Sequence, residues 1–416
     1  MREEFVSFRY KKRIFILLDF NCAFENTHHW SSMAIYGNFL KVQRIFFEFW
    51  VPFYVSPNVY LKMQELGSVN KCLRSNQYFS KSLYKSSYSF LLATITNLFL
   101  AKLQFRFFKK INVAIRYALL ALYLVPVIVR LINANRKYEV TLVFPTLDYL
   151  GLWLIKLLLP RFTSFNFYIR RTGAELHSPF STGKELDDLL NIVDSEDGKR
   201  VRIGIPTLNL LRITKARVAN PSRIFWSPLP SVEKNHTKIF NLDQKIRIGF
   251  PGTAKMSKGF DDIPKILEKI SKEKIDFKVY IQKASYPWVN YEKSRQRIIS
   301  ICPDLIEYDA VLSVNEYELF LDQLDIIILP YQKKYYEEAD SGILYEAADR
   351  GIPIICNSGL GFTEEVVRFG IGISQDQFKT FKEAIYMIIS KETLMYISAY
   401  NKLRNQKLVD FFTPYN

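Results

Sequence analysis

The chain has 416 residues, of which 49% are hydrophobic and 24% charged, and these values exclude a disordered or collagen-like chain. Its four Cys form no CxxC pair, which excludes a disulfide scaffold or a structural zinc site and is typical of a reducing compartment. Residues 1–240 hold 34 Lys and Arg against 16 Asp and Glu, whereas residues 241–416 hold 23 against 25. The basic half predicts an anionic partner: nucleic acid, an anionic membrane surface or a phosphorylated substrate.

In the first half, we predict strands and one helix from apolar runs and their spacing: strands at 13–20, 49–56, 139–146 and 165–170, and a helix at 151–159. The first apolar run follows a basic stretch but leads to no A-x-A cleavage site, so we interpret it as a buried strand rather than a signal peptide. The longest uncharged apolar run, 117–129, is 13 residues long. A membrane-spanning helix needs about 20, so a buried or interfacial helix is the better interpretation.

In the second half, strands and helices are predicted to alternate: strands at 245–250, 277–282, 325–330 and 353–357, and helices at 260–271, 315–324, 340–350 and 362–368. Apolar strands separated by helices predict a parallel sheet covered on both faces, with ligands beyond the carboxyl ends of the strands. Residues 222–244 turn polar and contain two Pro, and we interpret them as a linker. We therefore expect an α/β protein of two doubly wound domains facing a cleft, an N-terminal one over 1–225 and a C-terminal one over 226–416, with a last helix free to pack back on the N-terminal domain.

A candidate phosphate-binding loop follows the first strand of the second domain, in the sequence KIRIGFPGTAKMSKGFDD. Gly252 lets the backbone approach a diphosphate, and Lys255 and Lys258 add positive charge just before Gly259 and a helix, whose N-terminus favours anions. The loop matches neither the P-loop nor the dinucleotide-binding pattern. An ordinary turn with solvated lysines is the alternative.

An acidic segment precedes another helix of this domain, in the sequence EEADSGILYEAADRGIPII. Glu338 lies in the predicted loop, Ser341 and Gly342 begin the helix, and Glu346 lies in it between apolar residues. A carboxylate accepts two hydroxyl hydrogen bonds at once, which suits a ribose or sugar diol. The alternatives are an exposed helix carboxylate at Glu346 and a charge complementing the helix dipole at Glu338.

Four pieces in fixed order resemble the donor-binding domain of GT-B glycosyltransferases, most closely the retaining family four, also called glycosyl transferases group 1: GFPGTAKMSKGF, LDIIILP, SGILYEAADRGIPII and GLGFTEEV. The resemblance covers about residues 222–375, in which IFWSPLP is similar to the interdomain entry of the family. It implies the GT-B fold, two Rossmann-like domains around a cleft that holds a UDP- or GDP-linked sugar, and no cofactor besides this substrate.

The resemblance also assigns roles to individual residues. It implies that Lys258 binds the diphosphate, that Lys255 replaces the usual arginine beside it, and that Glu346 holds the ribose of the nucleotide. Glu338 completes the E-x7-E motif as a sugar-contacting glutamate. The remaining residues implied at the donor site are glycines and polar residues of the neighbouring turns: Gly252, Ser341, Gly342, Gly359, Gly361 and Glu365.

Sugar transfer needs stabilisation of the diphosphate leaving group, which the two lysines and a helix N-terminus would supply without a metal. No DxD-like metal pair is visible in the sequence. The resemblance favours retention of configuration, although inversion stays open. We take His28 as a candidate catalytic residue on the acceptor side, together with His29, Asp148 and His177; the alternative for each His is a surface residue.

Residues 81–137 alternate apolar and basic side chains, a composition suited to a helix lying in an anionic leaflet. The alternatives are a core helix with a solvated basic edge and a nucleic-acid surface, for which the sequence shows no RRM, KH or helix-turn-helix signature. We expect a cytoplasmic protein, peripheral on the inner face of the plasma membrane.

Together these features predict a glycosyltransferase that moves a sugar from a nucleotide-diphosphate sugar to a lipid-linked or growing polysaccharide acceptor in cell-surface glycan biosynthesis. Two alternatives remain: a catalytically inactive GT-B scaffold in glycan assembly, and a nucleic-acid-binding protein. Nucleic acid is not an expected partner.

Overall fold

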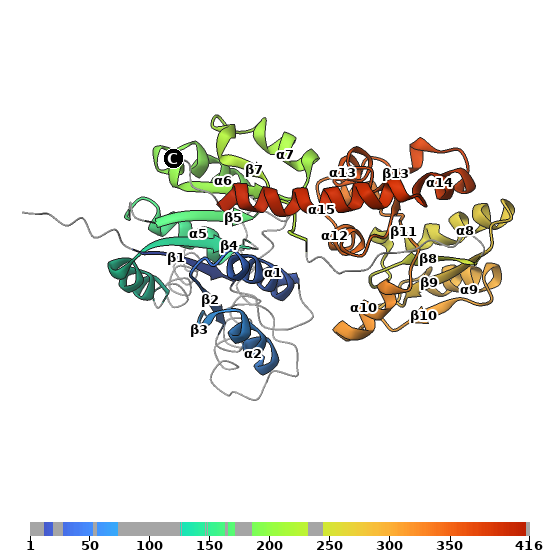
Figure 1. Ribbon diagram of the computed structural model, residues 1–416, viewed down its shortest axis with the longest axis horizontal. Coiled ribbons are helices and arrows are strands. Elements are labelled where there is room, and N and C mark those ends of the chain that lie inside the picture. Colours follow the sequence, from blue (N-terminus) through green and yellow to red (C-terminus); the bar gives the residue numbers. More distant parts are fainter. Residues whose placement is uncertain are drawn as a thin grey trace, which may run out of the picture. The chain divides into compact units, whose positions relative to one another are not determined.

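The computed structural model describes residues 12–19, 28–52, 56–73, 125, 127–145, 147, 149–162, 165–170, 185–231 and 244–412. Contacts divide these residues into two compact units, one up to Arg202 and one from Ile203. The strands form two sheets, of seven and six strands (Figure 1). The pairs of neighbouring strands are parallel wherever their register is defined.

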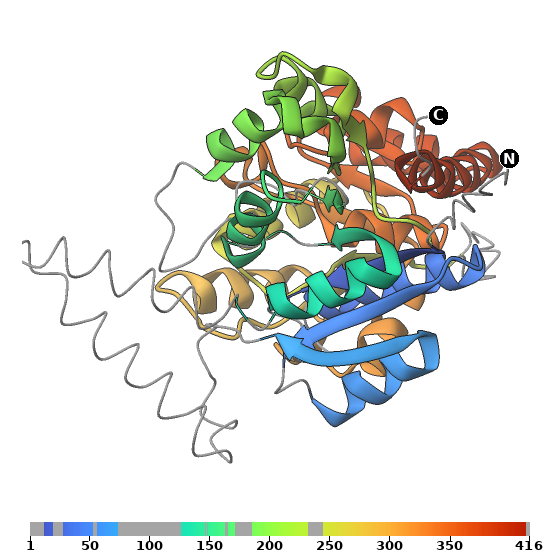
Figure 2. The same ribbon diagram turned by 90° about the vertical axis from the view of Figure 1, so that its left-hand side faces the viewer.

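The first sheet has the order β3-β2-β1-β4-β5-β6-β7. Its strands are β1 (Lys12–Leu18), β2 (Phe47–Pro52), β3 (Ser68–Leu73), β4 (Tyr138–Phe144), β5 (Phe165–Arg170), β6 (Val201–Ile205) and β7 (Ile224–Trp226). β1 and β4 pair side by side, and each is buried over its last five residues. Continuous burial of this kind requires cover on both faces of the sheet. Figure 2 shows the N-terminal strands of this sheet in blue, lying next to one another.

The helical elements that accompany the first sheet in the chain are α1 (His28–Val42), α2 (Pro57–Leu66), α5 (Tyr149–Leu158), α6 (Glu185–Asp194), η3 (Glu196–Arg200), α7 (Leu208–Lys215) and η4 (Pro221–Arg223). Residues 127–137 are also helical. α7 begins after Thr207, whose side-chain oxygen accepts a hydrogen bond from the N–H of Leu210 and so caps the helix.

The second sheet has the order β10-β9-β8-β11-β12-β13. Its strands are β8 (Ile246–Phe250), β9 (Phe277–Gln282), β10 (Ile306–Tyr308), β11 (Ile326–Leu329), β12 (Ile354–Cys356) and β13 (Gly372–Ser374). Successive side chains of β11 enter different hydrophobic clusters: Ile326 and Ile328 lie in one, Ile327 and Leu329 in the other. Because side chains alternate across a strand, β11 is buried on both faces of the sheet.

The helical elements of this part of the chain are η5 (Met256–Lys258), η6 (Phe260–Asp262), α8 (Ile263–Lys272), α9 (Tyr291–Ile301), α10 (Val314–Asp322), α11 (Lys333–Tyr336), α12 (Gly342–Asp349), α13 (Thr363–Arg368), η7 (Gln375–Gln377), α14 (Phe381–Ile388) and α15 (Lys391–Phe412). Buried residues of α8, α9 and α14 belong to one cluster, and those of α10, α12 and α15 to the other. The two sets of helices therefore cover opposite faces of the second sheet.

The long helix α15 is fixed by a buried arginine. Arg404 is 0% exposed; it donates to Asp349 Oδ1 of α12 at 2.9 Å and to the carbonyl of Leu229 at 2.6 Å. The carbonyl of Pro230 accepts a third hydrogen bond at 3.1 Å. Because a buried charge is tolerated only when it is paired and hydrogen-bonded, this network ties α15 to α12 and to residues 229–230.

The α/β class and the two doubly wound domains expected from the sequence are confirmed, and the four strands predicted in the second half are present with shifts of one residue at most. The predicted linker at 222–244 differs: residues 224–226 form β7, because Ile224 fills a buried place at the edge of the first sheet. Contacts divide the chain after Arg202, whereas the first sheet continues to Trp226, so the domain boundary at 225 stays a prediction.

Most of the basic region 81–137 lies outside the described residues, as do the central residues of the apolar run at 117–129. In the parts of the chain that the structure describes, no helix has the length and apolar character needed to cross a membrane.

Candidate functional site

The loop after β8 is held by two glycines with left-handed backbone. Gly252 has φ +85°, and a Cβ there would lie 2.2 Å from Lys258 Nζ. Gly259 has φ +71°, and a Cβ there would lie 1.8 Å from the carbonyl oxygen of Pro330, at the end of β11. Only glycine fits such positions without strain or collision. The loop therefore packs directly against the carboxyl end of the central strand.

Lys258 is a half-buried cation without an anionic partner. No hydrogen bond or ion pair to its Nζ is found among the described residues, and the ring of Tyr331 lies 5.8 Å from the nitrogen. Burial and, to a smaller extent, the positive charge of Lys255 lower the pKa of Lys258 to about 8, against the opposing charge of Glu346. A largely desolvated ammonium that has no partner is a candidate anion site.

Glu346 projects from α12 and is held by two neighbours. The Tyr317 hydroxyl of α10 donates to Glu346 Oε2 at 2.8 Å, and Arg350 Nη1 donates to the backbone carbonyl of Glu346 at 3.1 Å. Burial raises the pKa of Glu346, whereas the hydrogen bond from Tyr317 and the charges of Arg350 and Lys258 oppose this rise. The other oxygen, Oε1, has no partner in the described part of the chain and is not among its fully enclosed unpaired atoms.

Lys258 and Glu346 lie within electrostatic range of each other. Each charge shifts the pKa of the other group, yet the two form no ion pair within 4.0 Å in the described structure. The N-terminus of α12 begins nearby at Gly342, where no side chain caps the helix and no atom lies within 4 Å of the place of a Cβ. A cation, a carboxylate and an uncapped helix N-terminus thus lie in one part of the second unit, and these groups suit a ligand with an anionic and a hydroxylated part.

The remaining predicted donor residues lie in two different environments. Ser341 is buried and hydrogen-bonded to Tyr331, so it belongs with Lys258. Gly361 is packed against the loop before α12: its N–H donates to the carbonyl of Tyr336 at 2.7 Å, and a Cβ there would lie 2.6 Å from the Ala339 carbonyl. These positions support the shape of the loop, and a ligand role for them stays a prediction.

Glu365 is 0% exposed, so its carboxyl lies inside the protein rather than on a surface. Oε1 accepts a hydrogen bond from the N–H of Leu208 at the start of α7, and Oε2 is buried without a partner in the described structure. Burial raises the pKa of Glu365 to about 8. The side chain is therefore placed to join α13 to α7, and its predicted donor contact stays untested.

The structure says less about the predicted catalytic residues other than Lys258. Glu338 is exposed between α11 and α12, and its carboxylate has no partner among residues 244–412. His28 begins α1, but its side chain lies outside the described residues. Asp148 and His177 lie outside them as well, so the acceptor-side candidates remain predictions.

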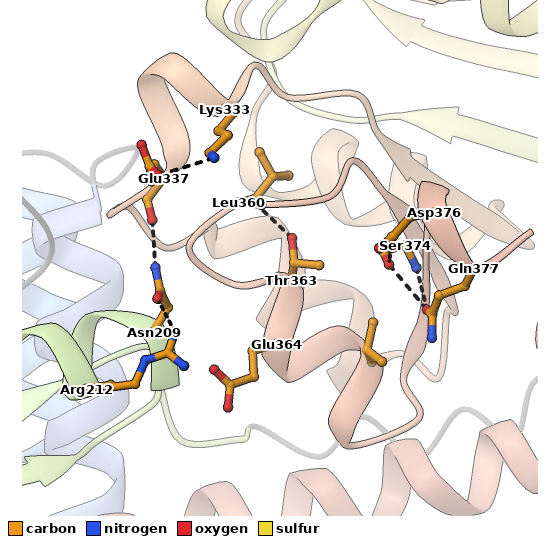
Figure 3. Close-up of a pocket in the computed structure, with 12 residues that line it drawn as sticks. Asn209, Arg212, Lys333, Glu337, Leu360, Thr363, Glu364, Ser374, Asp376 and Gln377 are labelled. Carbon is orange, nitrogen blue, oxygen red and sulfur yellow. Dashed lines mark hydrogen bonds and ion pairs between the residues drawn. The ribbon is translucent and has the colours of Figure 1, made fainter.

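A separate pocket of about 420 Å³ is lined by twelve residues (Figure 3): Asn209, Arg212, Lys333, Glu337, Gly359, Leu360, Thr363, Glu364, Val367, Ser374, Asp376 and Gln377. Asn209 donates to the carbonyl of Glu337 at 3.1 Å, and Lys333 pairs with the Glu337 carboxylate at 3.4 Å. The lining mixes both charges with hydroxyls and amides, which is suited to a hydroxyl-rich ligand. It includes Gly359 of the predicted turn but neither Lys258 nor Glu346.

Three residues around Glu346 and Lys258 are not predictable from local sequence patterns, namely Tyr317, Tyr331 and Arg350. Tyr317 is one of two aromatic residues at helical spacing in α10, and its bond to Glu346 depends on how α10 packs against α12. Arg350 is 4% exposed and donates to Asp322 of α10 at 2.8 Å, which joins the same two helices. Charge spacing along one helix could not have revealed either contact.

Comparison with models of protein families, and with curated proteins, gives no match. Among the solved structures that are similar over nearly the whole chain are the following three. HepE of Anabaena in complex with UDP-glucose has 11% identity and a TM-score of 0.55, covering 96% of both chains. The apo lipopolysaccharide outer core galactosyltransferase WaaB has 13% identity and a TM-score of 0.54, covering 96% of this chain and 99% of its own.

The third, a glycosyltransferase from Rickettsia africae, has 11% identity and a TM-score of 0.52, covering 97% of this chain and 95% of its own. Identities this low establish the fold and no more. With its two parallel sheets in two Rossmann-like domains, the chain has the GT-B fold.

Proposed function

We propose that the protein is a glycosyltransferase that moves a sugar from a nucleotide-diphosphate sugar to a lipid-linked or growing polysaccharide acceptor in cell-surface glycan assembly. The observation that carries the donor half is the half-buried, unpartnered ammonium of Lys258, which lies within electrostatic range of Glu346 and near the uncapped N-terminus of α12. The structural neighbours support the proposal, because one of them is a complex with UDP-glucose and two are named as glycosyltransferases.

Each of the three groups has one task in this proposal. The Lys258 ammonium and the N–H groups at the start of α12 hold the diphosphate, and Lys255 adds a second positive charge at the exposed edge of the loop. Glu346 accepts a hydrogen bond from a ribose hydroxyl. Because phosphate charge grows as the glycosidic bond breaks, fixed positive groups stabilise the transition state more than the bound donor.

The acceptor half of the proposal rests on charge. The excess of Lys and Arg over Asp and Glu lies in residues 1–240, and residues 241–416 are close to neutral. A basic acceptor domain suits an anionic lipid surface, where lipid-linked sugars are found, and this favours a peripheral protein at the inner face of the plasma membrane. Retention of configuration, without a metal, is the course that we propose for the transfer.

Isothermal titration with UDP and with GDP tests the donor site. We expect one of the two to bind the unaltered chain, and Lys258→Met and Glu346→Gln each to weaken that binding by at least about tenfold, the usual effect of losing a hydrogen bond to a charged group. Lys265→Met is the matched control, because Lys265 is exposed on α8 and only pairs weakly with Asp262 at 4.0 Å.

Unchanged affinity in both site variants would show that the nucleotide binds elsewhere, and the proposed donor site would be wrong. Binding of neither nucleotide would remove the donor-site proposal altogether.

A further inference from the structure

The hydrogen bond between Tyr317 and Glu346 joins two helices at the proposed ribose site. Tyr317 lies on α10 and Glu346 on α12, and the hydroxyl donates to Oε2 at 2.8 Å. Burial, and the nearby negative charge of Glu346, raise the pKa of Tyr317 well above its ordinary value. The phenol therefore keeps its proton and remains a donor throughout the physiological range.

The hydrogen bond from Tyr317 gives the two carboxylate oxygens of Glu346 different roles. Oε2 is occupied by Tyr317, whereas Oε1 has no partner in the described structure and is not completely enclosed by it. A carboxylate on a flexible side chain would otherwise turn freely and present either oxygen. With one oxygen fixed, the direction in which the other one faces is set before a ligand arrives.

We infer that Tyr317 is a positioning residue for ribose recognition, whose hydroxyl holds one oxygen of Glu346 so that the other is presented to a ribose hydroxyl of a nucleoside diphosphate. The inference rests on the proposed function, since it assumes that Glu346 contacts the ribose. It adds that discrimination between ribose and its deoxy forms depends on a residue that does not touch the ligand.

The protonation of Glu346 is governed by groups from four segments of the second unit. The hydroxyl of Tyr317 and the charge of Arg350 favour the carboxylate, as does the ammonium of Lys258, whereas burial and the charge of Asp349 favour the acid. Tyr331 also lies within the range of its charge. Removing the Tyr317 hydroxyl takes away a stabilising hydrogen bond, so the pKa of Glu346 rises further.

The experiment compares two ligands, UDP and 2′,3′-dideoxyuridine diphosphate, by titration calorimetry between pH 5 and 8. Both carry the same diphosphate, so the ratio of their dissociation constants cancels phosphate titration and the contribution of Lys258. In the unaltered protein we expect UDP to bind more tightly at neutral pH, and this preference to fade as falling pH protonates Glu346.

For Tyr317→Phe we expect the preference for UDP at neutral pH to fall by about tenfold, the typical effect of a charge-assisted hydrogen bond, and the midpoint of its loss to move to higher pH. Tyr308→Phe is the matched control: its hydroxyl accepts from Gln323 at the end of α10 at 2.9 Å and does not contact Glu346. The control should keep the preference and the midpoint of the unaltered protein. A purely structural role for Tyr317 would weaken both ligands equally and leave the midpoint unchanged.

A double variant shows whether Tyr317 acts through Glu346. In a Glu346→Gln background, adding Tyr317→Phe should change the ligand preference no further. The comparison of Glu346→Gln with the double variant can also be made if Tyr317→Phe alone proves unstable. The neutral amide of the Glu346→Gln variant removes the carboxylate charge that the Tyr317 hydroxyl stabilises. An additional loss in the double variant overturns the inference.

The remaining outcomes separate the two proposals. If UDP binds and is preferred, but Tyr317→Phe keeps the preference and the midpoint, Tyr317 has no positioning role while the donor site stands. If UDP binds without any preference over the dideoxy ligand, Glu346 does not read the ribose, and the inference is wrong although nucleotide binding is intact. If neither ligand binds, the proposed function fails first and the inference fails with it.

Discussion

Lys258 is the residue on which the proposed site depends, and the structure leaves it without an anionic partner in the described part of the chain. Its ammonium is only half exposed, so the empty protein holds a positive charge that neither water nor a carboxylate fully solvates. An anionic ligand would remove this cost. Such residues are commonly functional, because a structural role alone would favour a paired or apolar side chain.

The destabilisation that the half-buried charge of Lys258 causes can be measured on the protein without a ligand. The pKa of Lys258 is lowered from 10.5 to about 8 by folding, so the unfolded chain binds this proton more tightly than the folded chain does. Stability should therefore rise with pH between about 8 and 10.5, and below pH 8 the buried charge destabilises the fold in full. We expect Lys258→Met to stabilise the empty protein by about 1 to 3 kcal/mol at pH 7, measured by denaturant unfolding.

The gain from Lys258→Met should shrink at pH 9.5, where the lysine of the folded, unaltered chain has lost most of its proton. Lys265→Met, at an exposed position, should change stability little at either pH. A Lys258→Met variant that is less stable than the unaltered chain at pH 7 would show that Lys258 has a stabilising partner after all.

At the scale of residues, the sequence predicts a site residue where that residue follows a strand in a short loop. Lys258 follows β8 and Glu346 is an acidic residue between apolar neighbours, and the structure brings these two together. Glu365 and Tyr317 could not be predicted in the same way. The burial of Glu365 results from the position of α7, which lies more than 150 residues earlier in the chain.

At the scale of elements, the loop from β8 to η6 is shaped by contact with β11. The Ser257 carbonyl accepts a hydrogen bond from the N–H of Gln332 at 3.0 Å, and Gly259 meets the Pro330 carbonyl. The end of one strand thus sets the position of the lysines that follow another. Since both strands are parallel and adjacent, their carboxyl ends form one edge, where the proposed diphosphate site lies.

Two glycine substitutions distinguish the effect of the contact between this loop and β11 from the general effect of replacing a glycine by alanine. Gly259→Ala places a Cβ on a left-handed residue against backbone, and we expect it to cost at least about 2 kcal/mol of stability. Gly342→Ala adds the same methyl group at the start of α12, where nothing lies within 4 Å and alanine favours the helix. Denaturant unfolding should show a large loss for the first and little change or a small gain for the second; equal losses would contradict the described loop contact.

The predicted elements agree with the structure best in the second sheet, where apolar strands and helical spacing alternate cleanly. β11 is predicted because four consecutive aliphatic residues can only be buried on both faces. The sequence does not predict β7, because its three residues lie in a polar segment with two Pro and are too few to show a hydrophobic period. Its strand state depends on pairing with β6, a contact that no local pattern reveals.

At the scale of the whole molecule, charge is distributed unevenly along the chain. Residues 1–240 carry 34 Lys and Arg against 16 Asp and Glu, while the remainder carries 23 against 25. The donor site described above belongs to the nearly neutral part. The basic part is therefore free to serve a different anionic partner, and a membrane surface is the one that we propose.

Liposome flotation of the full chain tests this proposal. We expect recovery with vesicles rich in phosphatidylserine, little recovery with phosphatidylcholine vesicles, and release from the anionic vesicles as salt rises, because the attraction is electrostatic and screened within about 10 Å at 0.1 M salt. Equal recovery with both vesicle types would contradict an electrostatic membrane partner. Recovery with neither type would exclude a membrane surface as the partner of the basic half.

The same half-buried amine has a chemical consequence beyond binding. With a pKa of about 8, an appreciable fraction of Lys258 is the free base in neutral solution, and a free amine is a nucleophile. An aldehyde that also carries a phosphate group would be guided to it and condense to an imine with loss of water, and borohydride would make that bond permanent. Burial in the fold, which lowers the pKa of Lys258 from 10.5 to about 8, therefore also makes this amine available for covalent capture.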